Sequence, residues 1–443
     1  MQILFVLPLL FGLYYLLRGR QDLVFLNVYL PCVILLPPYY AVRIPHLPPE
    51  SAASWALFPL GVSLLFYPIP HLRLRRMDLW VTLFALSLAA SELLREPSPK
   101  DGANMFAARV TQVFLAYVVG RRLIEPNLRV ATMQRLVLLV VCLTPFILFE
   151  YRMAQNPWVR MATGVFHLDI GSFVQMRDGH ARVQASFGHA IIAGIVFFTV
   201  FLLNCSLARL YKRDRNRLGP VIGWLERYHL PALLMVLFLW LTQSRGPMLG
   251  AVTGYSILQI PRFRHLKVAA FTVILVLAVA GAGIYSFFNK YTNAVDDGSL
   301  SEAQTSAMYR RDLLKNYEPI VDEGGWLGWG ALNIPHVEGQ LSIDNAYLLL
   351  ELSQGKLGIC LFIVIIAEGL GTTAYRAFSF HSPEARFLAF TLLGAMLGIF
   401  LSLYTVYEGP PVGAICFLLL GWSQSIEDDV SGAPKFYFRR VFA

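Results

Sequence analysis

Long apolar stretches recur along the whole chain, and this repetition is the feature that most limits what the chain can fold into. A helix needs about 20 predominantly apolar residues to cross the hydrocarbon core of a membrane. Stretches of that kind alternate here with short polar breaks, and only 15% of the 443 residues are charged while 56% are hydrophobic. We therefore predict an all-α, polytopic membrane protein with about 12–14 transmembrane helices, forming a single transmembrane domain over residues 1–443.

The expected spans are defined by hydropathy, with boundaries good to a few residues. They are 3–17, 22–40, 53–70, 78–94, 104–120, 133–150, 187–208, 229–243, 247–261, 267–288, 346–370, 386–404 and 408–424. The first of them lacks a basic leading region and a small-residue cleavage site, so we expect a retained helix and not a signal peptide.

Lysine and arginine concentrate in every second break between spans, which indicates the orientation of the chain. By the positive-inside rule these breaks are cytoplasmic, and the complementary breaks, among them the large loops 151–186 and 289–345, lie outside. The second loop is expected to be partly helical and to carry part of an active site. The net charge of +9 is thus mainly a topology signal. Nucleic-acid binding is not expected, because the basic residues are divided among short loops.

The sequence gives no indication of a disulfide framework, a metal or another cofactor. All five cysteines lie within apolar runs, where cysteine behaves as a small hydrophobic residue. The outer loops contain no His-x-x-x-His, no cysteine pair and no clustered Asp-x-Asp, and the scattered histidines do not make a metal site.

Arginines in the outer loops depart from the charge rule and are therefore candidates for function. Arg182 begins the run that leads through His189 into a span, and Arg310 with Arg311 lies on a helix predicted within 289–345. A capping-box spacing from Ser299 to Glu302 predicts the start of that helix, and Pro319 with Gly324 and Gly325 predicts its end.

Arg109 is expected a few residues inside a span, where a charge is costly and usually faces a cavity or a partner. The candidate partners are Glu150, Glu351 and Glu368. A purely structural ion pair is the alternative to a role in binding.

Arg245 interrupts two apolar runs within Ser244-Arg245-Gly246, at an outer turn. Gly246 and Pro247 account for the turn, but they do not account for the arginine. A guanidinium offers the planar, bidentate donor fork that suits a phosphate or pyrophosphate at the membrane surface. Snorkelling of the side chain towards water is the alternative.

Asp344 ends the large polar loop, directly before an apolar run, so it faces water and the start of a helix. The helix dipole stabilises an anion there, which suits a reactive carboxylate. The alternative is that the residue only caps the helix, since aspartate and asparagine are both common caps.

Several short motifs, in order and on the same side of the membrane, carry a resemblance to a known family. They are Leu241 to Gly250 around Arg245, Tyr309-Arg310 leading to Gly328-Trp329-Gly330, Asp344-Asn345 followed by Gly355 and Gly358, Phe149-Glu150, and Arg182 to His189. Together they resemble the O-antigen ligase and polymerase superfamily over roughly residues 105–425. Members of this superfamily are integral-membrane glycosyltransferases of the GT-C type, which act on the periplasmic face of the bacterial inner membrane.

The resemblance implies transfer of a glycan from an undecaprenyl-pyrophosphate donor, without a nucleotide sugar or a metal. Arg245 and Arg310 would neutralise the donor pyrophosphate, and the residue before Asn345 would act as the base. Arg109, Glu150, Arg182, His189, Arg311, Asn345 and Tyr347 are the further candidates for binding substrate. The implied partners are the lipid-linked oligosaccharide donor, a glycan acceptor, membrane lipids and other polysaccharide-assembly proteins.

One departure from the pattern affects the expected reaction. In the ligase branch, which attaches O-antigen to lipid A-core, a histidine precedes the asparagine, whereas this chain has Asp344. Aspartate can also accept a proton from a sugar hydroxyl. We therefore predict an inverting polymerase of exopolysaccharide or O-antigen repeat units, with a ligase as the alternative.

Two other classes of protein remain as alternatives. A transporter or flippase, including an inorganic-carbon transporter, is also polytopic, but the sequence lacks matching Gly- or Pro-broken spans in two halves. A non-catalytic scaffold for polysaccharide assembly would leave Arg245 and Asp344 unexplained.

Overall fold

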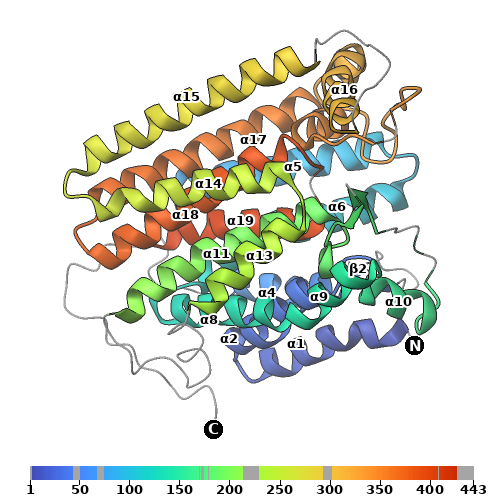
Figure 1. Cartoon of the computed structure of the whole chain (residues 1–443). Helices are drawn as coiled ribbons and strands as arrows, with labels where there is room; N and C mark the ends of the chain where they lie inside the picture. The colour runs from blue at the N-terminus through green and yellow to red at the C-terminus, as the bar shows by residue number, and fades with distance from the viewer. Residues whose placement is uncertain are drawn as a thin grey trace.

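The computed structural model describes residues 2–42, 50–66, 74–168, 170, 174–177, 179–212, 229–292, 302–340, 342–407 and 409–426. This part of the chain is almost entirely helical, and most of its long helices run side by side in roughly one direction (Figure 1). The strands form two short antiparallel pairs, β1 (Ala41–Val42) with β2 (Glu50–Ser51), and β3 (Met176–Arg177) with β4 (His180–Ala181).

The helices of the N-terminal part are η1 (Gln2–Val6), α1 (Leu7–Leu17), α2 (Gln21–Leu23), η2 (Val24–Tyr29), α3 (Leu30–Leu35), α4 (Ala52–Phe66), α5 (Arg76–Arg95), α6 (Pro99–Val110), η3 (Thr111–Leu115), α7 (Ala116–Leu123), α8 (Pro126–Cys142), α9 (Thr144–Met153) and α10 (Pro157–Gly164). Those of the C-terminal part are η4 (Ala185–Phe187), α11 (Ala190–Lys212), α13 (Leu230–Leu241), α14 (Arg245–Gln259), η6 (Ile260–Arg262), α15 (Leu266–Thr292), α16 (Glu302–Gly324), α17 (Ala346–Ser379), α18 (Pro383–Leu403) and α19 (Pro410–Ser425).

Each predicted span contains a helix, and the all-α polytopic fold class is confirmed. Among the described residues, 6 helices are long and apolar enough to cross a membrane, with shorter apolar helices at Leu4–Leu17, Gln21–Leu35, Ala52–Phe66 and Leu230–Leu241. A helix bonds all of its own backbone groups, which is what a lipid environment requires. The apolar runs therefore fold as helices throughout.

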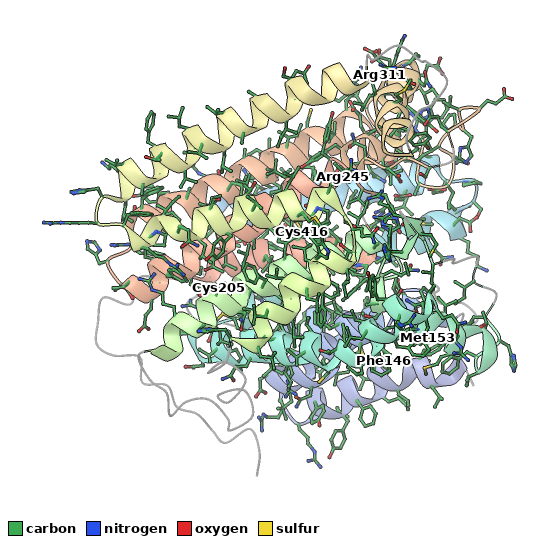
Figure 2. The ribbon with its side chains drawn as sticks, viewed as in Figure 1. Phe146, Met153, Cys205, Arg245, Arg311 and Cys416 are labelled. Atoms are coloured by element: carbon green, nitrogen blue, oxygen red, sulfur yellow. The ribbon has the colours of Figure 1, made fainter. Side chains whose placement is uncertain are left out.

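Where the structure describes them, the Lys- and Arg-rich breaks and the complementary breaks lie at opposite ends of the bundle (Figure 1). We call the end that holds α6, α10 and α16 the α16 end, and the opposite end, which holds the η6–α15 and α17–α18 turns, the basic end (Figure 1). Figure 2 shows Arg245 at the end of α14 that faces α16. The described parts of 151–186 and 289–345 thus gather at the same end as Arg245.

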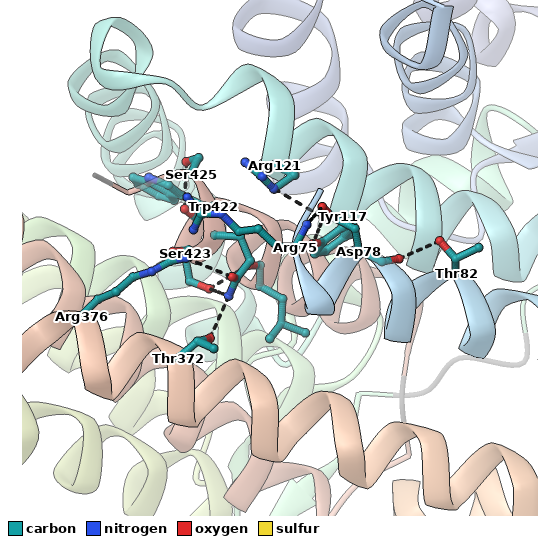
Figure 3. Close-up of polar contacts among 12 residues, drawn as sticks. Arg75, Asp78, Thr82, Tyr117, Arg121, Thr372, Arg376, Trp422, Ser423 and Ser425 are labelled. Carbon is teal, nitrogen blue, oxygen red and sulfur yellow. Dashed lines mark hydrogen bonds and ion pairs between the residues drawn. The ribbon is translucent and has the colours of Figure 1, made fainter. Parts of the chain in front are cut away.

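Arginines at the basic end also hold the helices together (Figure 3). Arg121 on α7 forms an ion pair with Asp78 on α5, with 3.4 Å between the Nε and Oδ1 atoms. Arg376 near the end of α17 donates a hydrogen bond to the carbonyl of Ser423 in the last turn of α19. A cation is favoured at the C-terminus of a helix, where carbonyls lack partners. These arginines therefore contribute packing as well as a topology signal.

Close backbone contact between α14 and α18 fixes the part of the bundle that carries Arg245. A Cβ added to Gly250 would lie 2.6 Å from the Gly398 carbonyl oxygen, and one added to Gly394 would lie 2.6 Å from that of Gly254. Glycines four residues apart on both helices leave room for this approach, as is common in membrane bundles. The start of α14 is consequently held tightly against the end of α18.

Helix α17 is interrupted at Gly355, where the backbone has φ 70° and ψ −171°. Residues 325–330 fill the interruption: the Trp329 amide donates to the Leu352 carbonyl at 2.8 Å, and the Lys356 amide donates to the Gly325 carbonyl at 3.1 Å. An added Cβ on Gly355 would collide with the Gly328 backbone. The glycines of the sequence motif thus bring the large loop and the broken helix into direct backbone contact.

Gly355→Ala is expected to lower the free energy of unfolding by at least about 2 kcal/mol, because the backbone geometry at Gly355 is adopted essentially only by glycine. Thermal unfolding of the purified protein in nanodiscs measures the effect. Gly371→Ala is the matched control, because Gly371 lies on the same helix with nothing within 4 Å of an added Cβ. Equal unfolding temperatures for the two variants would contradict this account of the break.

Helix α16 packs on the first part of α17 and forms a small second core. Leu313, Tyr317, Leu348 and Leu352 are its buried members. The predicted helix is present and ends at Gly324 as expected, but Pro319 lies inside it, so the use of that proline as a stop signal was wrong. The predicted capping box at Ser299 lies outside the described residues, while Glu302 is the first residue of the helix.

Candidate functional site

Asp344 lies in the turn that enters α17, and the large loop holds this turn in place. The Ser342 hydroxyl donates to Asp344 Oδ1 at 3.0 Å. The Tyr309 hydroxyl on α16 accepts from the Ser342 amide at 2.9 Å and donates to the Ser342 carbonyl at 2.6 Å. Tyr309 therefore docks α16 two residues before the carboxylate, which gives Asp344 a defined position although it is only half-buried.

Asn345, and not Asp344, caps α17. The Asn345 Oδ1 atom accepts from the amides of Tyr347 at 3.0 Å and Leu348 at 3.3 Å, and Asn345 is buried. These two bonds satisfy first-turn donors that would otherwise lack partners. The Asp344 carboxylate is therefore not needed as the cap, and the capping alternative for this residue loses its support.

Arg245 is the first residue of α14 and follows a strained turn. Gln243 has a φ of 49°, in the left-handed region that non-glycine residues rarely adopt. The Ser244 hydroxyl donates to the Thr242 carbonyl at 3.0 Å and makes no capping bond to α14. Arg245 is exposed and makes no hydrogen bond or ion pair with any described residue. Its guanidinium is thus available at a helix N-terminus.

Arg182 holds the turn from which Arg245 projects. Its guanidinium donates to the Thr242 carbonyl at 3.2 Å, to the Ser244 hydroxyl at 3.0 Å and to Gln175 Oε1 at 2.7 Å. The Val183 amide also donates to the Leu241 carbonyl at 3.1 Å. Arg182 is buried. The geometry gives it a positioning role, in which it caps the C-terminal end of α13.

His189 lies directly before α11 and is within electrostatic reach of both Arg182 and Asp344. Its Nδ1 atom accepts from the Ile191 amide at 3.2 Å, and its Nε2 atom lies 3.4 Å from Gln175 Nε2. Burial and the Arg182 charge lower the pKa of His189 to about 4, against the opposing charge of Asp344. The ring is therefore neutral near pH 7. The lone pair of Nδ1 is occupied by the Ile191 amide, so this nitrogen is not free to take a substrate proton in the present arrangement.

Glu150 is fully buried at the end of α9 and holds the loop that carries Arg182. One carboxylate oxygen accepts from Asn156 Nδ2 at 2.9 Å and the Gln184 amide at 3.2 Å, and the other accepts from the Ala185 amide at 2.9 Å. Both oxygens are thus occupied by protein donors. The geometry gives Glu150 a structural role beneath the site.

Four predicted residues remain, and each lies in a different environment. Arg109 on α6 pairs with the buried Glu92 at 3.9 Å, so its partner is none of the three glutamates proposed from the sequence. The Tyr347 hydroxyl donates to the Phe400 carbonyl at 2.7 Å, joining α17 to α18.

Arg311 is exposed on α16 and its Nε lies 3.1 Å from Asp312 Oδ1. The backbone of Arg310 follows the docked Tyr309, while its side chain lies outside what the structure describes.

The turn between α18 and α19, residues 404–407, was predicted as an outer break, but its contacts with the start of α14 and with His189 were not foreseen from the sequence. A Cβ added to Gly246 would collide with the Thr405 hydroxyl, so this turn lies directly against the start of α14. The Tyr407 and His189 rings meet at 5.8 Å between centroids with an interplanar angle of 76°. Burial and the Asp344 charge raise the pKa of Tyr407. A lone tyrosine in a short turn carries no pattern that would have identified it.

The α16 end thus carries a carboxylate at the start of α17 and a cation at the N-terminus of α14. Asp344 can accept a proton, and Arg245 with the first amides of α14 can bind an anion. Among the described residues, no group of three or more His, Cys, Asp or Glu side chains could hold a metal ion.

The comparison with protein families supports this arrangement. Residues 230–363 match the family model described as O-antigen ligase, a segment that runs from α13 into α17 and includes Arg245, Arg310 and Asp344. The resemblance inferred from the sequence is confirmed for this segment, and the match supports an enzyme role of the O-antigen ligase or polymerase type. Arg182, His189 and Tyr407 lie outside the matched residues. A search of curated proteins finds none that matches the chain.

Proposed function

We propose that the protein is a membrane glycosyltransferase that polymerises lipid-pyrophosphate-linked oligosaccharide repeat units. Asp344 would take the proton from an acceptor sugar hydroxyl while the hydroxyl oxygen attacks the anomeric carbon of the donor. The bond from that carbon to the pyrophosphate breaks, and the lipid pyrophosphate leaves with the bonding electron pair. Attack opposite the leaving group inverts the anomeric configuration. The acceptor would be a second lipid-linked unit, and the product a longer chain.

The observation that carries the proposal is that Asp344 is separated from the capping role. Asn345 satisfies the first amides of α17, while Tyr309 and Ser342 hold the aspartate in the turn. A half-buried carboxylate with its own supporting contacts, in a segment that matches the O-antigen ligase family, fits a general base.

The leaving group would be stabilised at the start of α14. The Ser244 side chain bonds backward to Thr242 and makes no capping bond to α14, and Arg245, the first residue of this helix, is exposed. Preorganised cations and helix dipoles favour charge that develops in a transition state. Arg310 would contribute a second cation from α16.

A ligase that transfers glycan to lipid A-core is the second candidate function, favoured by the description of the matching family. The aspartate at position 344 in place of a histidine favours the polymerase. Purified protein should convert lipid-pyrophosphate-linked repeat units into a ladder of products without any added acceptor. Transfer only after addition of lipid A-core would favour the ligase, and export of the lipid-linked unit into vesicles without glycan transfer would favour a transporter.

We propose further that the protein lies in the bacterial inner membrane with the α16 end in the periplasm. Single cysteines placed in a cysteine-free background at Leu332 and Phe263 test this orientation. The two side chains are similarly exposed, at 52% and 59%, and lie near the α16 end and the basic end respectively. A membrane-impermeant maleimide added to intact spheroplasts is expected to label position 332 and not 263. The reverse pattern would reject both the orientation and a periplasmic reaction.

A further inference from the structure

Tyr407 has the geometry of a ligand-binding side chain that the matched family segment does not include. It follows α18 in the 404–407 turn, is half-buried, and packs its ring edge-on against His189 at 5.8 Å. Its hydroxyl makes no hydrogen bond with any described residue. A tyrosine hydroxyl without a protein partner, on a half-buried ring, is suited to bonding a ligand.

Two contacts hold this tyrosine in a defined place. His189 is itself anchored, because its Nδ1 accepts from the Ile191 amide at 3.2 Å. Thr405, two residues before Tyr407, lies against Gly246 at the start of α14. The turn is therefore fixed on one side by the start of α11 and on the other by the residue that follows Arg245.

The neighbouring charge determines what Tyr407 can do. Asp344 is close enough for its negative charge, together with burial, to raise the pKa of Tyr407. The phenol therefore remains protonated and acts as a hydrogen-bond donor. His189 is neutral and adds no competing charge. A donor hydroxyl on an aromatic ring, beside a carboxylate, is complementary to a sugar with several hydroxyl groups.

We propose that Tyr407 binds the acceptor glycan, donating a hydrogen bond to a sugar oxygen and thereby orienting the hydroxyl whose proton passes to Asp344. The assignment rests on the proposed glycosyl transfer and names a residue for the acceptor side of the same site. Tyr407 takes no part in bond making: its contribution is to the position and affinity of the acceptor. The donor pyrophosphate, by contrast, is assigned to Arg245 at the start of α14.

The test is Tyr407→Phe in the purified full-length protein, with lipid-linked repeat units from the source cells as donor and the same unit on a short prenyl pyrophosphate as acceptor. Loss of one neutral hydrogen bond should raise KM for the acceptor by about 5–10-fold. We expect kcat, KM for the donor and the unfolding temperature to stay close to those of the wild type. Tyr404→Phe is the matched control, because Tyr404 lies on the same turn and is exposed at 56%.

Three results would overturn the assignment: an unchanged acceptor KM, an equal rise in donor KM, or an equal effect of Tyr404→Phe. Asp344→Asn, measured in parallel, tests the proposed function separately, because loss of a base lowers kcat and leaves acceptor affinity in place. A variant at position 344 that kept full turnover would reject the proposed base without affecting the result for Tyr407.

Discussion

Arg245→Ala is expected to lower the rate of glycan transfer by about 10²–10³-fold, the usual effect of removing one preorganised group that stabilises developing charge. The unfolding temperature should not change, because the Arg245 side chain is exposed and bonds to no described residue. Exposed substitutions of this kind usually alter stability by less than about 0.5 kcal/mol. Chain extension and thermal unfolding are measured on the same purified samples.

Arg245→Lys should recover only part of the lost rate, since lysine keeps the charge but loses the planar donor fork that fits two phosphate oxygens. The matched control is Arg160→Ala: Arg160 is exposed at the α16 end and its Nη1 atom donates to Gln155 at 3.1 Å. This control should transfer glycan at the wild-type rate. Equal losses in Arg160→Ala and Arg245→Ala would mean that positive charge at this end acts only in general attraction of the substrate.

Arg182→Ala is the comparison for Arg245→Ala, because Arg182 is expected to position the turn and Arg245 to bind the pyrophosphate. The Arg182 guanidinium is buried and donates to the buried Thr242 and Ser244 and to Gln175, so its removal deletes these charged hydrogen bonds and leaves a gap beneath the turn. Such losses typically cost about 1–3 kcal/mol. Activity and stability should therefore fall together in Arg182→Ala, whereas Arg245→Ala should lose activity alone.

The helices and their order were predictable because hydropathy is a local property. Each helix can be recognised from the hydropathy of its own residues. The alternation of Lys- and Arg-rich breaks indicates which turns lie at the same end of the bundle. The helical part of the large loop was predictable in the same way, apart from Pro319, which lies within the C-terminal part of α16.

The contacts that build the site were not predictable, because they join residues far apart in the chain. Arg182 was recognised as unusual, yet nothing near it in sequence indicated that its partners would be at 242–244. The glycine pattern after Asn345 was recognised, but its cause is the backbone of Gly328 packed into the break at Gly355. Tyr407 gave no signal, since its environment is made by α11 and the Asp344 turn.

The local sequence at Asp344-Asn345 left two explanations open, and only the hydrogen bonds distinguish them. Either residue type can cap a helix, so adjacent aspartate and asparagine are ambiguous. The amides of Tyr347 and Leu348 donate to Asn345, and Ser342 donates to Asp344. Asn345 therefore caps the helix, and the Asp344 carboxylate remains available for chemistry.

Substitution of Asn345, which caps α17, is expected to lower stability and not the rate of proton transfer. It is therefore the control for substitution of Asp344, the proposed base. Asn345→Ala should destabilise the protein by about 1 kcal/mol, as for other removed caps. Asn345→Ser, which keeps a capping oxygen, should restore most of that loss. Both variants should retain proton transfer, because the carboxylate at position 344 is unchanged.

Asp344→Asn is expected to abolish polymerisation while leaving the fold intact. The substitution keeps the size of the side chain and an oxygen that can accept from Ser342, but an amide cannot take a proton at neutral pH. General acid–base catalysis contributes about 10²–10⁴-fold in rate, so the loss should far exceed any stability effect. Asp344→His should recover activity, because imidazole is also a base near neutral pH.

The measurement is in vitro extension of the lipid-pyrophosphate-linked repeat unit by wild type, Asp344→Asn and Asp344→His at equal folded concentration. If Asp344→Asn lowered the rate by only about threefold, that loss would be far smaller than the loss expected for a missing base. This result would reject Asp344 as the base. Glu150 and His189 could not then replace it in their present arrangement, because the Glu150 oxygens accept from Asn156, Gln184 and Ala185. His189 Nδ1 likewise accepts from Ile191. Such a result would therefore require the loop around Arg182 to rearrange when substrate binds, and the search for a base would move to that loop.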